Sequence, residues 1–351
     1  MPSYTGVLSG RNAFSGYEKI FMEYLSIIKT VKRDCILWRS SMIYTLTTNP
    51  AIDMNISTKG MERAKVNRTF DTVYTPNGKG VNVTLTLKHY GVDSTVTGFF
   101  GGFSGKYIVE ELEKRQVAVK PVWVGDTTRI NIFLNDGEGE FKFVNSGSFV
   151  GRDQQEEMLN LFETAEDLSC LVISGSLPPG IEPSYYESIM SICKKRGIDV
   201  VLDISSPKLK DLLKYQPLLI KPNDEEIEEI FGIKIKDEED ILHVLTFLKE
   251  QGARNVLLTL GSKGAYFSNG EDVYYSSSQP VKLLSSACAG DAALASFLSL
   301  WLDHPENVED ALKRSAATGA NVAESNALGD FAKVDTCLLY TSDAADELDG
   351  V

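Results

Sequence analysis

Short apolar runs rich in β-branched residues alternate with segments of helical periodicity between residues 42 and 335, and this alternation restricts the possible folds more than any other feature. Repeated strand–helix–strand units at this spacing predict an α/β fold with a mainly parallel central sheet and helices on both faces. In such a fold the loops after the strands are the expected place for ligand-binding residues. The expected strands are 43–48, 94–100, 170–175, 199–205, 218–223 and 255–261, and the expected helices are 105–116, 183–197, 223–232 and 237–252.

Two segments interrupt the alternation, residues 54–76 and 128–147. Both read as short strands with turns, and Asn-Asp-Gly-Glu-Gly at 135–139 is typical of a β-hairpin. Their alternating polar and apolar positions predict a small accessory sheet that acts as a lid. Residues 81–91 also alternate with period two, but the Gly-Lys-Gly before them indicates a helix start, so we predict a helix there.

The two ends of the chain differ in sequence pattern from the alternating region. Residues 1–41 have no clear periodicity and an apolar strand begins abruptly at Met42, so we interpret 1–41 as a non-native extension. A targeting peptide is the alternative, but no basic start followed by an apolar run and a small-residue cleavage site supports it. We interpret 336–351 as an artefactual tail, which leaves one expected domain at 42–335.

Charge and cysteine usage narrow the classes of partner. The formal net charge of −14 disfavours nucleic acid and anionic membranes, so an anionic substrate would need a locally basic pocket. No apolar run approaches the roughly 18 residues of a membrane-spanning helix, so none is expected. The five cysteines are scattered without Cys-x-x-Cys spacing, which predicts reduced thiols in a cytoplasmic protein.

Two glycine-rich loops follow expected strands. In the loop at 75–82, Gly78 and Gly80 allow the backbone to approach a ligand closely, and Lys79 adds a positive charge. The loop at 258–266 follows the end of a strand and carries a lysine between two glycines. A plain turn is the alternative interpretation of each loop when it is considered alone.

A third loop combines an amide with acids. The strand at 218–223 delivers Lys221 and Asn223 to its carboxyl end, and Glu226 follows on the same face of the next helix. Hard oxygen groups of this kind suit Mg²⁺, bound through water. The alternative is a helix start in which Asn223 is the N-cap residue and the acids lie in the first turn.

The stretch at 285–302 places small residues before one acid, Asp291, and then an apolar run. Free backbone N–H groups and the helix dipole at this helix start would form an anion site. The alternative is that Asp291 is merely an N-cap residue. The same dipole is expected to lower the pKa of Asp291. The Walker A, His-Glu-x-x-His and Gly-x-Ser-x-Gly motifs are absent, and no Gly-x-Gly-x-x-Gly follows the first strand.

Eight motifs in one order resemble the ribokinase-like phosphofructokinase B family, closest to its 1-phosphofructokinases and tagatose-6-phosphate kinases. The resemblance covers essentially all of 42–335 and implies a three-layer α/β/α fold with a β-strand lid. The motifs are NPAID (49–53), PNGKGVN (76–82), GFFGGFSG (98–105), TRIN (128–131), SGSLPPG (174–180), KPNDEE (221–226), TLGSKGA (259–265) and AGDAALASF (289–297).

The activity that the resemblance implies is ATP- and Mg²⁺-dependent phosphorylation of fructose 1-phosphate at its 6-hydroxyl. Phosphorylation of tagatose 6-phosphate is the alternative, and a non-catalytic sensor of sugar phosphates is a second one. The resemblance also suggests a homodimer formed through the lid strands, whose exposed edge gives a physical motive for pairing.

The motif positions imply a role for each candidate residue. The residue matching the catalytic base is Asp291, and those matching the anion hole are Cys288, Ala289 and Gly290. The residues matching the sugar-binding positions are Asp53, Gly78, Lys79 and Asn82, with Arg129 on the phosphate that the substrate already carries. The residues in the nucleotide loops are Lys221, Asn223, Thr259, Gly261 and Gly264, with Asn321 beside the adenine. The pair matching the Mg²⁺ position is Asn223 and Glu226, through water.

Two residues depart from the family pattern, and each stands where a glycine is usual. Asn77 opens the Asn-Gly-Lys-Gly motif, and we expect it to tolerate the positive φ that the turn would need. Cys288 opens the Cys-Ala-Gly-Asp motif before the catalytic base. If that position requires positive φ, the cysteine is expected to cost activity.

Overall fold

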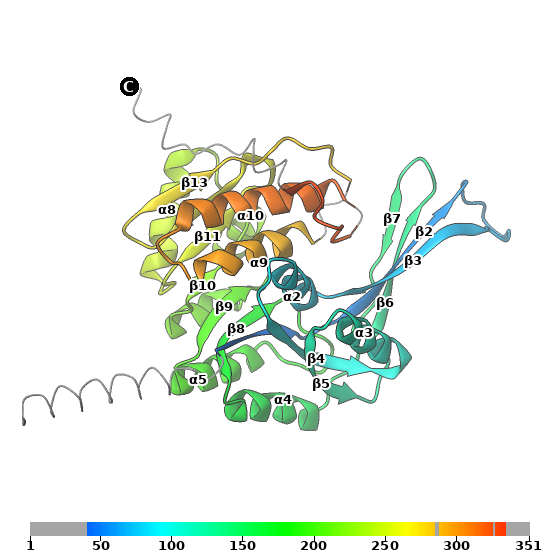
Figure 1. Ribbon diagram of the computed structural model, residues 1–351, viewed down its shortest axis with the longest axis horizontal. Coiled ribbons are helices and arrows are strands. Elements are labelled where there is room, and N and C mark those ends of the chain that lie inside the picture. Colours follow the sequence, from blue (N-terminus) through cyan, green and yellow to red (C-terminus); the bar gives the residue numbers. More distant parts are fainter. Residues whose placement is uncertain (1–40, 285–287, 326, 335–351) are drawn as a thin grey trace, which may run out of the picture. The chain divides into compact units, whose positions relative to one another are not determined.

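A nine-stranded sheet forms the centre of the protein in a computed structural model that describes residues 41–284, 288–325 and 327–334 (Figure 1). Six neighbouring pairs are parallel, and β12 and β13 extend one edge in antiparallel fashion, so the predicted mainly parallel sheet is confirmed. The order of strands is β13 (Val273–Ser276), β12 (Ala265–Ser268), β11 (Val256–Thr259), β10 (Leu219–Ile220), β9 (Asp199–Asp203), β8 (Leu168–Ser174), β1 (Met42–Thr47), β4 (Ser94–Gly101) and β5 (Ala118–Val124).

Helices cover both faces of this sheet because its strands are apolar on both sides. In β8, Leu171 and Ile173 belong to one core, whereas Cys170 and Val172 belong to the opposite one. The first core includes side chains of α4 (Arg152–Thr164), α5 (Tyr185–Arg196), the short α6 (Leu209–Leu212), α7 (Asp224–Phe231) and α8 (Glu238–Glu250). The second includes side chains of α2 (Lys79–His89), α9 (Ala289–Trp301) and α10 (Val308–Ala323), and a smaller cluster joins α2 to α3 (Gly102–Lys114).

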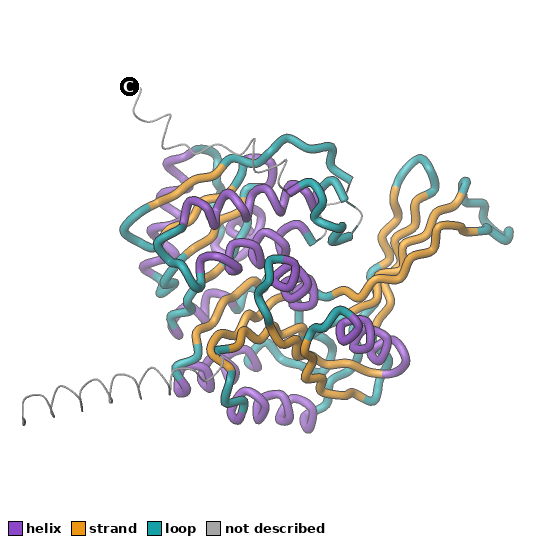
Figure 2. The backbone as a smooth tube through the Cα atoms, viewed as in Figure 1, coloured by secondary structure: helices purple, strands orange, loops and turns teal. Residues whose placement is uncertain are grey.

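The segments expected to form a lid build a separate four-stranded sheet that projects from the central one (Figures 1 and 2). Its order is β3 (Thr69–Asn77), β2 (Ala51–Thr58), β6 (Arg129–Asn135) and β7 (Glu140–Phe143). The backbone N–H of Asp136 donates to the carbonyl of Gly139, which closes the expected hairpin between β6 and β7. The lid strands therefore lead directly into the region where the central strands end.

The period-two segment at 81–91 is helical, as predicted, and forms most of α2. Its alternating polar residues are buried as well as its apolar ones, which a half-exposed strand would not show. Thr84 shares a 2.7 Å hydrogen bond with Thr45 of β1, and the Thr86 hydroxyl donates to the carbonyl of Asn82. The polar positions thus face the sheet and the helix backbone rather than solvent.

Within the described part of the chain, no helix is both long and apolar enough to span a membrane. The three cysteines in that part, Cys170, Cys193 and Cys288, are free thiols. Cys35 and Cys337 lie outside the described residues, as do almost all of the extension at 1–41 and the whole of the tail at 336–351.

Candidate active site

Asp291 lies in the first turn of α9 and is 5% exposed. The N-cap residue of this helix is Cys288, and no side chain caps the helix, so the N-cap alternative for Asp291 is wrong. The carboxylate of Asp291 accepts a 2.8 Å hydrogen bond from Nδ2 of Asn82 on α2. The first turns of two helices that pack together therefore position this acid.

Burial raises the pKa of Asp291 to about 6, and the nearby carboxylate of Asp203 adds to the rise. Lys79, Asn82 and Lys221 act in the opposite direction but do not cancel it. The expectation that the helix dipole would lower this pKa is therefore wrong, because loss of water around a buried carboxylate outweighs the dipole. A carboxylate with this pKa is a better proton acceptor near neutral pH than an ordinary aspartate.

Asp203 is the functional candidate that the sequence interpretation missed. It ends β9, is fully buried at the side chain, and pairs with Lys79 Nζ at 3.5 Å and Lys221 Nζ at 3.1 Å. These two cations lower its pKa despite its burial. An acid at the end of an apolar strand, Val-Val-Leu-Asp, was the available signal. Asp203 thus holds two lysines next to the carboxylate of Asp291.

Glycines let α2 begin against the end of β1. Gly78 is the N-cap residue of α2 and has φ of 137°, in the region that favours glycine. A side chain at Gly80 would collide with Thr47 and lie 2.9 Å from the backbone of Leu46. This close approach places Lys79 at the carboxyl end of the central sheet, where it reaches Asp203.

Asp53 lies in β2, at the base of the lid. Its carboxylate accepts hydrogen bonds from Nδ2 of Asn131, at 2.9 Å, and from Nδ2 of Asn77. Burial raises its pKa, although these hydrogen bonds and Arg129 act against the rise. Asn131 and Asn77 were not predicted to contact a functional residue, and their amides fix the orientation of the Asp53 carboxylate.

Arg129 begins β6 and is half-buried. Its guanidinium donates to the backbone carbonyls of Asn49, at 3.0 Å, and Asn145, at 3.2 Å. The Nε atom is buried and has no hydrogen-bond partner among the described residues. A buried N–H group without a partner is costly, so Nε is a donor whose hydrogen-bonding capacity is unused among the described residues.

The two departures from the family pattern have different structural consequences. Cys288 has φ of 66°, so this position does adopt the left-handed conformation that glycine tolerates best. Asn77 is not among the residues with positive φ, because it is the last residue of β3 and Gly78 makes the turn. The expectation about the backbone of Asn77 is therefore wrong, and the role of this residue lies in its side chain.

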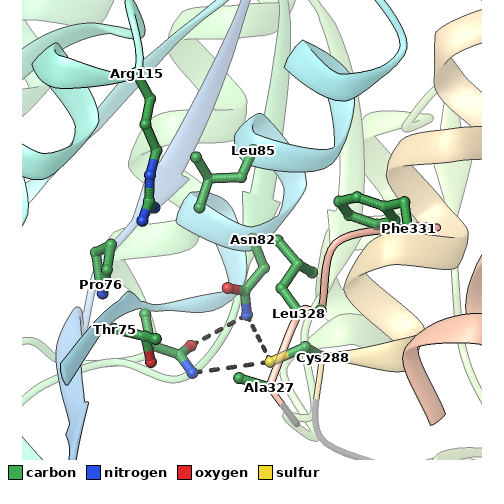
Figure 3. Close-up of a pocket in the computed structure, with 11 residues that line it drawn as sticks. Thr75, Pro76, Asn82, Leu85, Arg115, Cys288, Ala327, Leu328 and Phe331 are labelled. Carbon is green, nitrogen blue, oxygen red and sulfur yellow. Dashed lines mark hydrogen bonds between the residues drawn. The ribbon is translucent and has the colours of Figure 1, made fainter. Parts of the chain in front are cut away.

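A cavity of about 390 Å³ adjoins this group of residues (Figure 3). Its wall includes Asn77, Asn82 and Cys288, whose side chains contact one another. The other lining residues are Thr75, Pro76, Leu85, Arg115, Ala327, Leu328, Gly329 and Phe331.

The candidate nucleotide residues lie along the neighbouring strand ends. Asn223 forms an isolated parallel bridge with Thr259, so the loops after β10 and β11 begin side by side. Gly261 and Gly264 both have positive φ in the turn after β11. Asn321 on α10 accepts from the backbone N–H of Lys333, and its buried Nδ2 has no hydrogen-bond partner among the described residues.

Asn223 and Glu226 form a reciprocal capping box at the start of α7. The Asn223 side chain accepts from the Glu226 N–H at 2.7 Å, and the Glu226 carboxylate accepts from the Asn223 N–H at 3.0 Å. The helix-start interpretation is therefore correct. It does not exclude the Mg²⁺ role, because carboxylate oxygens that accept one hydrogen bond can accept another from a metal-bound water.

The donor groups present fit Mg²⁺. Lys79 experiences the negative charges of Asp203, Asp291 and Glu226 together, so carboxylates as well as ammonium groups lie at this end of the sheet. No group of three His, Cys, Asp or Glu side chains in the described ranges is placed to bind a metal directly. Mg²⁺ ordinarily keeps several waters and takes phosphate oxygens, which agrees with a site of this kind.

The central sheet, the lid and a buried acid at a helix start, with lysines nearby, define a kinase that phosphorylates an alcohol group of a carbohydrate. Residues 43–333 match the pfkB family carbohydrate kinases, and the chain belongs to this family. The predicted family, fold and phosphotransferase activity are thereby confirmed.

Three known proteins show how near the similarity is. D-tagatose-1-phosphate kinase from Klebsiella oxytoca is 46% identical over 297 residues, which cover 85% of this chain and 97% of that protein. 1-Phosphofructokinase from Bacillus subtilis is 34% identical over 289 residues, covering 82% and 94%. The tetrameric inhibited form of phosphofructokinase-2 from Escherichia coli superposes with a TM-score of 0.77 at 27% identity, covering 86% and 99%.

Proposed function

We propose that this kinase transfers the γ-phosphoryl group of ATP to the 6-hydroxyl of a ketohexose 1-phosphate, giving the 1,6-bisphosphate and ADP. D-tagatose 1-phosphate is the first candidate acceptor, because the relative with 46% identity is named for it. D-fructose 1-phosphate is the second, supported by the 1-phosphofructokinase at 34% identity and by the resemblance noted in the sequence.

The observation that carries the proposal is the environment of Asp291. Its carboxylate is buried, accepts a hydrogen bond from Asn82 and has a pKa of about 6. As the 6-hydroxyl oxygen bonds to the γ-phosphorus, its proton passes to Asp291 while the bond from phosphorus to the bridging oxygen of ADP breaks. The hydrogen bond from Asn82 occupies one carboxylate oxygen and leaves the other for the sugar hydroxyl.

The residues around Asp291 supply positive potential for the transferred group. In the first turn of α9, the backbone N–H groups of Ala289 and Gly290 point toward the N-terminal end of the helix. Lys221 Nζ lies close by, 3.5 Å from the position that a Cβ atom on Gly290 would take. Lys79 lies at the start of α2 on the other side of Asp203. Glu226 and Asn223 would hold Mg²⁺ through water, and the ion would supply further charge neutralisation when bound with ATP.

The acceptor sugar binds at the base of the lid in this proposal. Asp53 accepts hydrogen bonds from sugar hydroxyls, and the amides of Asn77 and Asn131 hold its carboxylate in place. Arg129 binds the 1-phosphate through its guanidinium, whose buried Nε would become accessible as the lid moves. Because Asp53 and Arg129 both belong to lid strands, lid closure would complete the acceptor site and exclude water.

The lid sheet also supports the proposed homodimer. Its side chains include apolar residues that remain 41–52% exposed: Phe70, Val73, Tyr74, Phe141 and Phe143. An exposed apolar sheet of this size favours association with a second copy. Light scattering of the purified protein tests this, with Phe143→Lys as the variant expected to dissociate the dimer.

The proposed reaction is tested by ADP release, measured with four acceptors at equal concentration: the 1-phosphates and 6-phosphates of D-tagatose and D-fructose. We expect the two 1-phosphates to be phosphorylated at least tenfold more efficiently than the two 6-phosphates. Preference for tagatose 6-phosphate would replace the proposal with the alternative from the sequence. Binding of the sugar phosphates without ADP release would support the sensor instead.

A further inference from the structure

The two side chains that replace the usual glycines contact each other. Asn77 Nδ2 lies 3.8 Å from Cys288 Sγ, although the residues are 211 positions apart. Asn77 ends a lid strand, whereas Cys288 is the N-cap residue of the helix that carries the proposed base. Glycines at both positions could not make this contact, so the contact depends on the two side chains present here.

One amide group connects the pair to the proposed base. Nδ2 of Asn82 lies 2.8 Å from Asp291 Oδ2, 3.1 Å from Asn77 Oδ1 and 3.3 Å from Cys288 Sγ. The carboxylate can only accept, so this atom of Asn82 must be the nitrogen. Two N–H groups serve three acceptors, and the sulfur, as the weakest acceptor, is held mainly by packing. Figure 3 shows the Asn82 amide directed toward the sulfur of Cys288.

The pair forms part of the wall between the acceptor residues and the cavity. Asn77 and Cys288 line the cavity of about 390 Å³. Asn77 also donates a hydrogen bond to Asp53, and the amide of Asn82 links Cys288 to Asp291. The other residues that line the cavity include apolar side chains, among them Leu85 and Phe331. Removing both side chains would open the acceptor site to this space.

The chain retains this arrangement at a conformational cost. The left-handed backbone of Cys288 is unfavourable for a residue with a side chain, and glycine would avoid this strain. Burial, together with Asp291 and Asp53, raises the pKa of the thiol, so the group stays neutral. The sulfur is therefore a compact uncharged surface beside the site rather than a nucleophile.

We propose that Asn77 and Cys288 act together as a specificity-determining pair, closing the acceptor site against the cavity so that only one configuration at sugar carbon 4 binds productively. This inference rests on the proposed function. D-tagatose and D-fructose differ only at carbon 4, two carbons from the 6-hydroxyl. When that hydroxyl faces Asp291, the carbon 4 substituent lies within reach of Cys288, because a single amide group separates the sulfur from the carboxylate.

The test is a double-mutant cycle of Asn77→Gly, Cys288→Gly and the double variant, with kcat/KM measured for both ketohexose 1-phosphates. A contact of this size in a substrate pocket changes discrimination by roughly tenfold or more. We expect the tagatose to fructose ratio of kcat/KM to move at least tenfold toward unity in the double variant. The two single changes should be non-additive by at least threefold, since the side chains touch.

Cys288→Ala is the matched control for backbone strain. It keeps the side-chain carbon that disfavours the left-handed conformation but removes the sulfur, so it should shift the ratio as Cys288→Gly does. An unchanged ratio in all variants would overturn the inference. An equal loss for both epimers would also overturn it, because it would show that the pair only supports the fold.

Calorimetric titration of the same variants with both epimers separates failure of the inference from failure of the proposed function. Wild-type protein that binds the epimers but releases no ADP would contradict the proposed function, and the ratio of its dissociation constants would still test the pair. Wild-type protein that binds neither epimer would overturn both proposals.

Discussion

The amide of Asn82 on α2 donates a hydrogen bond to the carboxylate of Asp291 on α9, with 2.8 Å between Nδ2 and Oδ2. Both residues are buried, and each lies in the first turn of its helix. The hydrogen bond fixes which carboxylate oxygen remains for the acceptor hydroxyl. The effect of Asp291 on turnover can therefore be measured separately from its effect on binding.

Asp291→Asn should lower kcat by about 10² to 10⁴-fold, the usual contribution of a general base. The amide cannot accept the hydroxyl proton, but its shape and the surrounding phosphate-binding groups are nearly unchanged. ADP release measures turnover, and calorimetric titration with ATP should give a dissociation constant within about threefold of the wild-type value. Full turnover in this variant would rule out Asp291 as the base.

The pH dependence of kcat/KM should show an acidic limb near pH 6, because the pKa of Asp291 is raised to about 6. Below this pH the carboxylate is protonated and cannot act as a base, so the rate should fall about tenfold per pH unit. An acidic limb near pH 4 would show that the site does not raise this pKa. The measurement requires ADP detection by chromatography, so that no coupling enzyme limits the range.

Asp203→Asn tests one cause of that raised pKa. Removing this negative charge leaves Lys79 and Lys221 acting on Asp291, so the acidic limb should move to lower pH.

The Asp291→Asn variant should be more stable than the wild type above pH 6. A carboxyl group whose folded-state pKa is raised stabilises the fold below the pKa of the unfolded chain and loses this contribution as pH rises through 6. Thermal unfolding at pH 4.5 and pH 8 measures the difference.

Arg129→Ala should raise KM for the ketohexose 1-phosphate by at least about tenfold while KM for ATP changes little. The guanidinium lies at the lid base, held by two backbone carbonyls, and its Nε has no partner among the described residues. Arg152→Ala, at the exposed start of α4, is the matched loss of an arginine and should change neither constant. Equal rises in both KM values would contradict the assignment.

Gly80→Ala should lower the free energy of unfolding by about 2 kcal/mol or more, the size typical of overpacking. The added carbon would collide with Thr47 and approach the backbone of Leu46, which cannot move without disturbing β1. Gly125→Ala is the control, because nothing lies within 4 Å of the corresponding position. Chemical denaturation of both variants gives the comparison, and similar stabilities would show that α2 can shift away from β1.

The sequence predicted the elements whose pattern is local. Strand–helix alternation and the hairpin at 135–139 indicated the sheet and lid because each depends on residues close together in the chain. The motif positions also implied roles in one active site for Asp291, Asn82 and Asp53. The structure brings the first two into direct contact and connects Asp53 to Asn82 through Asn77.

Properties that depend on tertiary surroundings were not predictable in the same way. The pKa of Asp291 has the opposite shift from the expected one, because burial and Asp203 exceed the dipole of its own helix. The side chain of Asn77 contacts residues from three other segments, so its sequence neighbours indicated only a turn. Asp203 was missed because its two lysine partners come from separate loops.

The lid strands carry the proposed acceptor residues at their base rather than at their tips. Asp53 lies near the start of β2, Asn77 ends β3, and Arg129 begins β6. Protein engineers who shorten this lid, or exchange it with that of another kinase, would need to cut beyond these positions, within 54–74. Deleting the whole lid would remove the proposed sugar-binding residues together with the strands that cover the site.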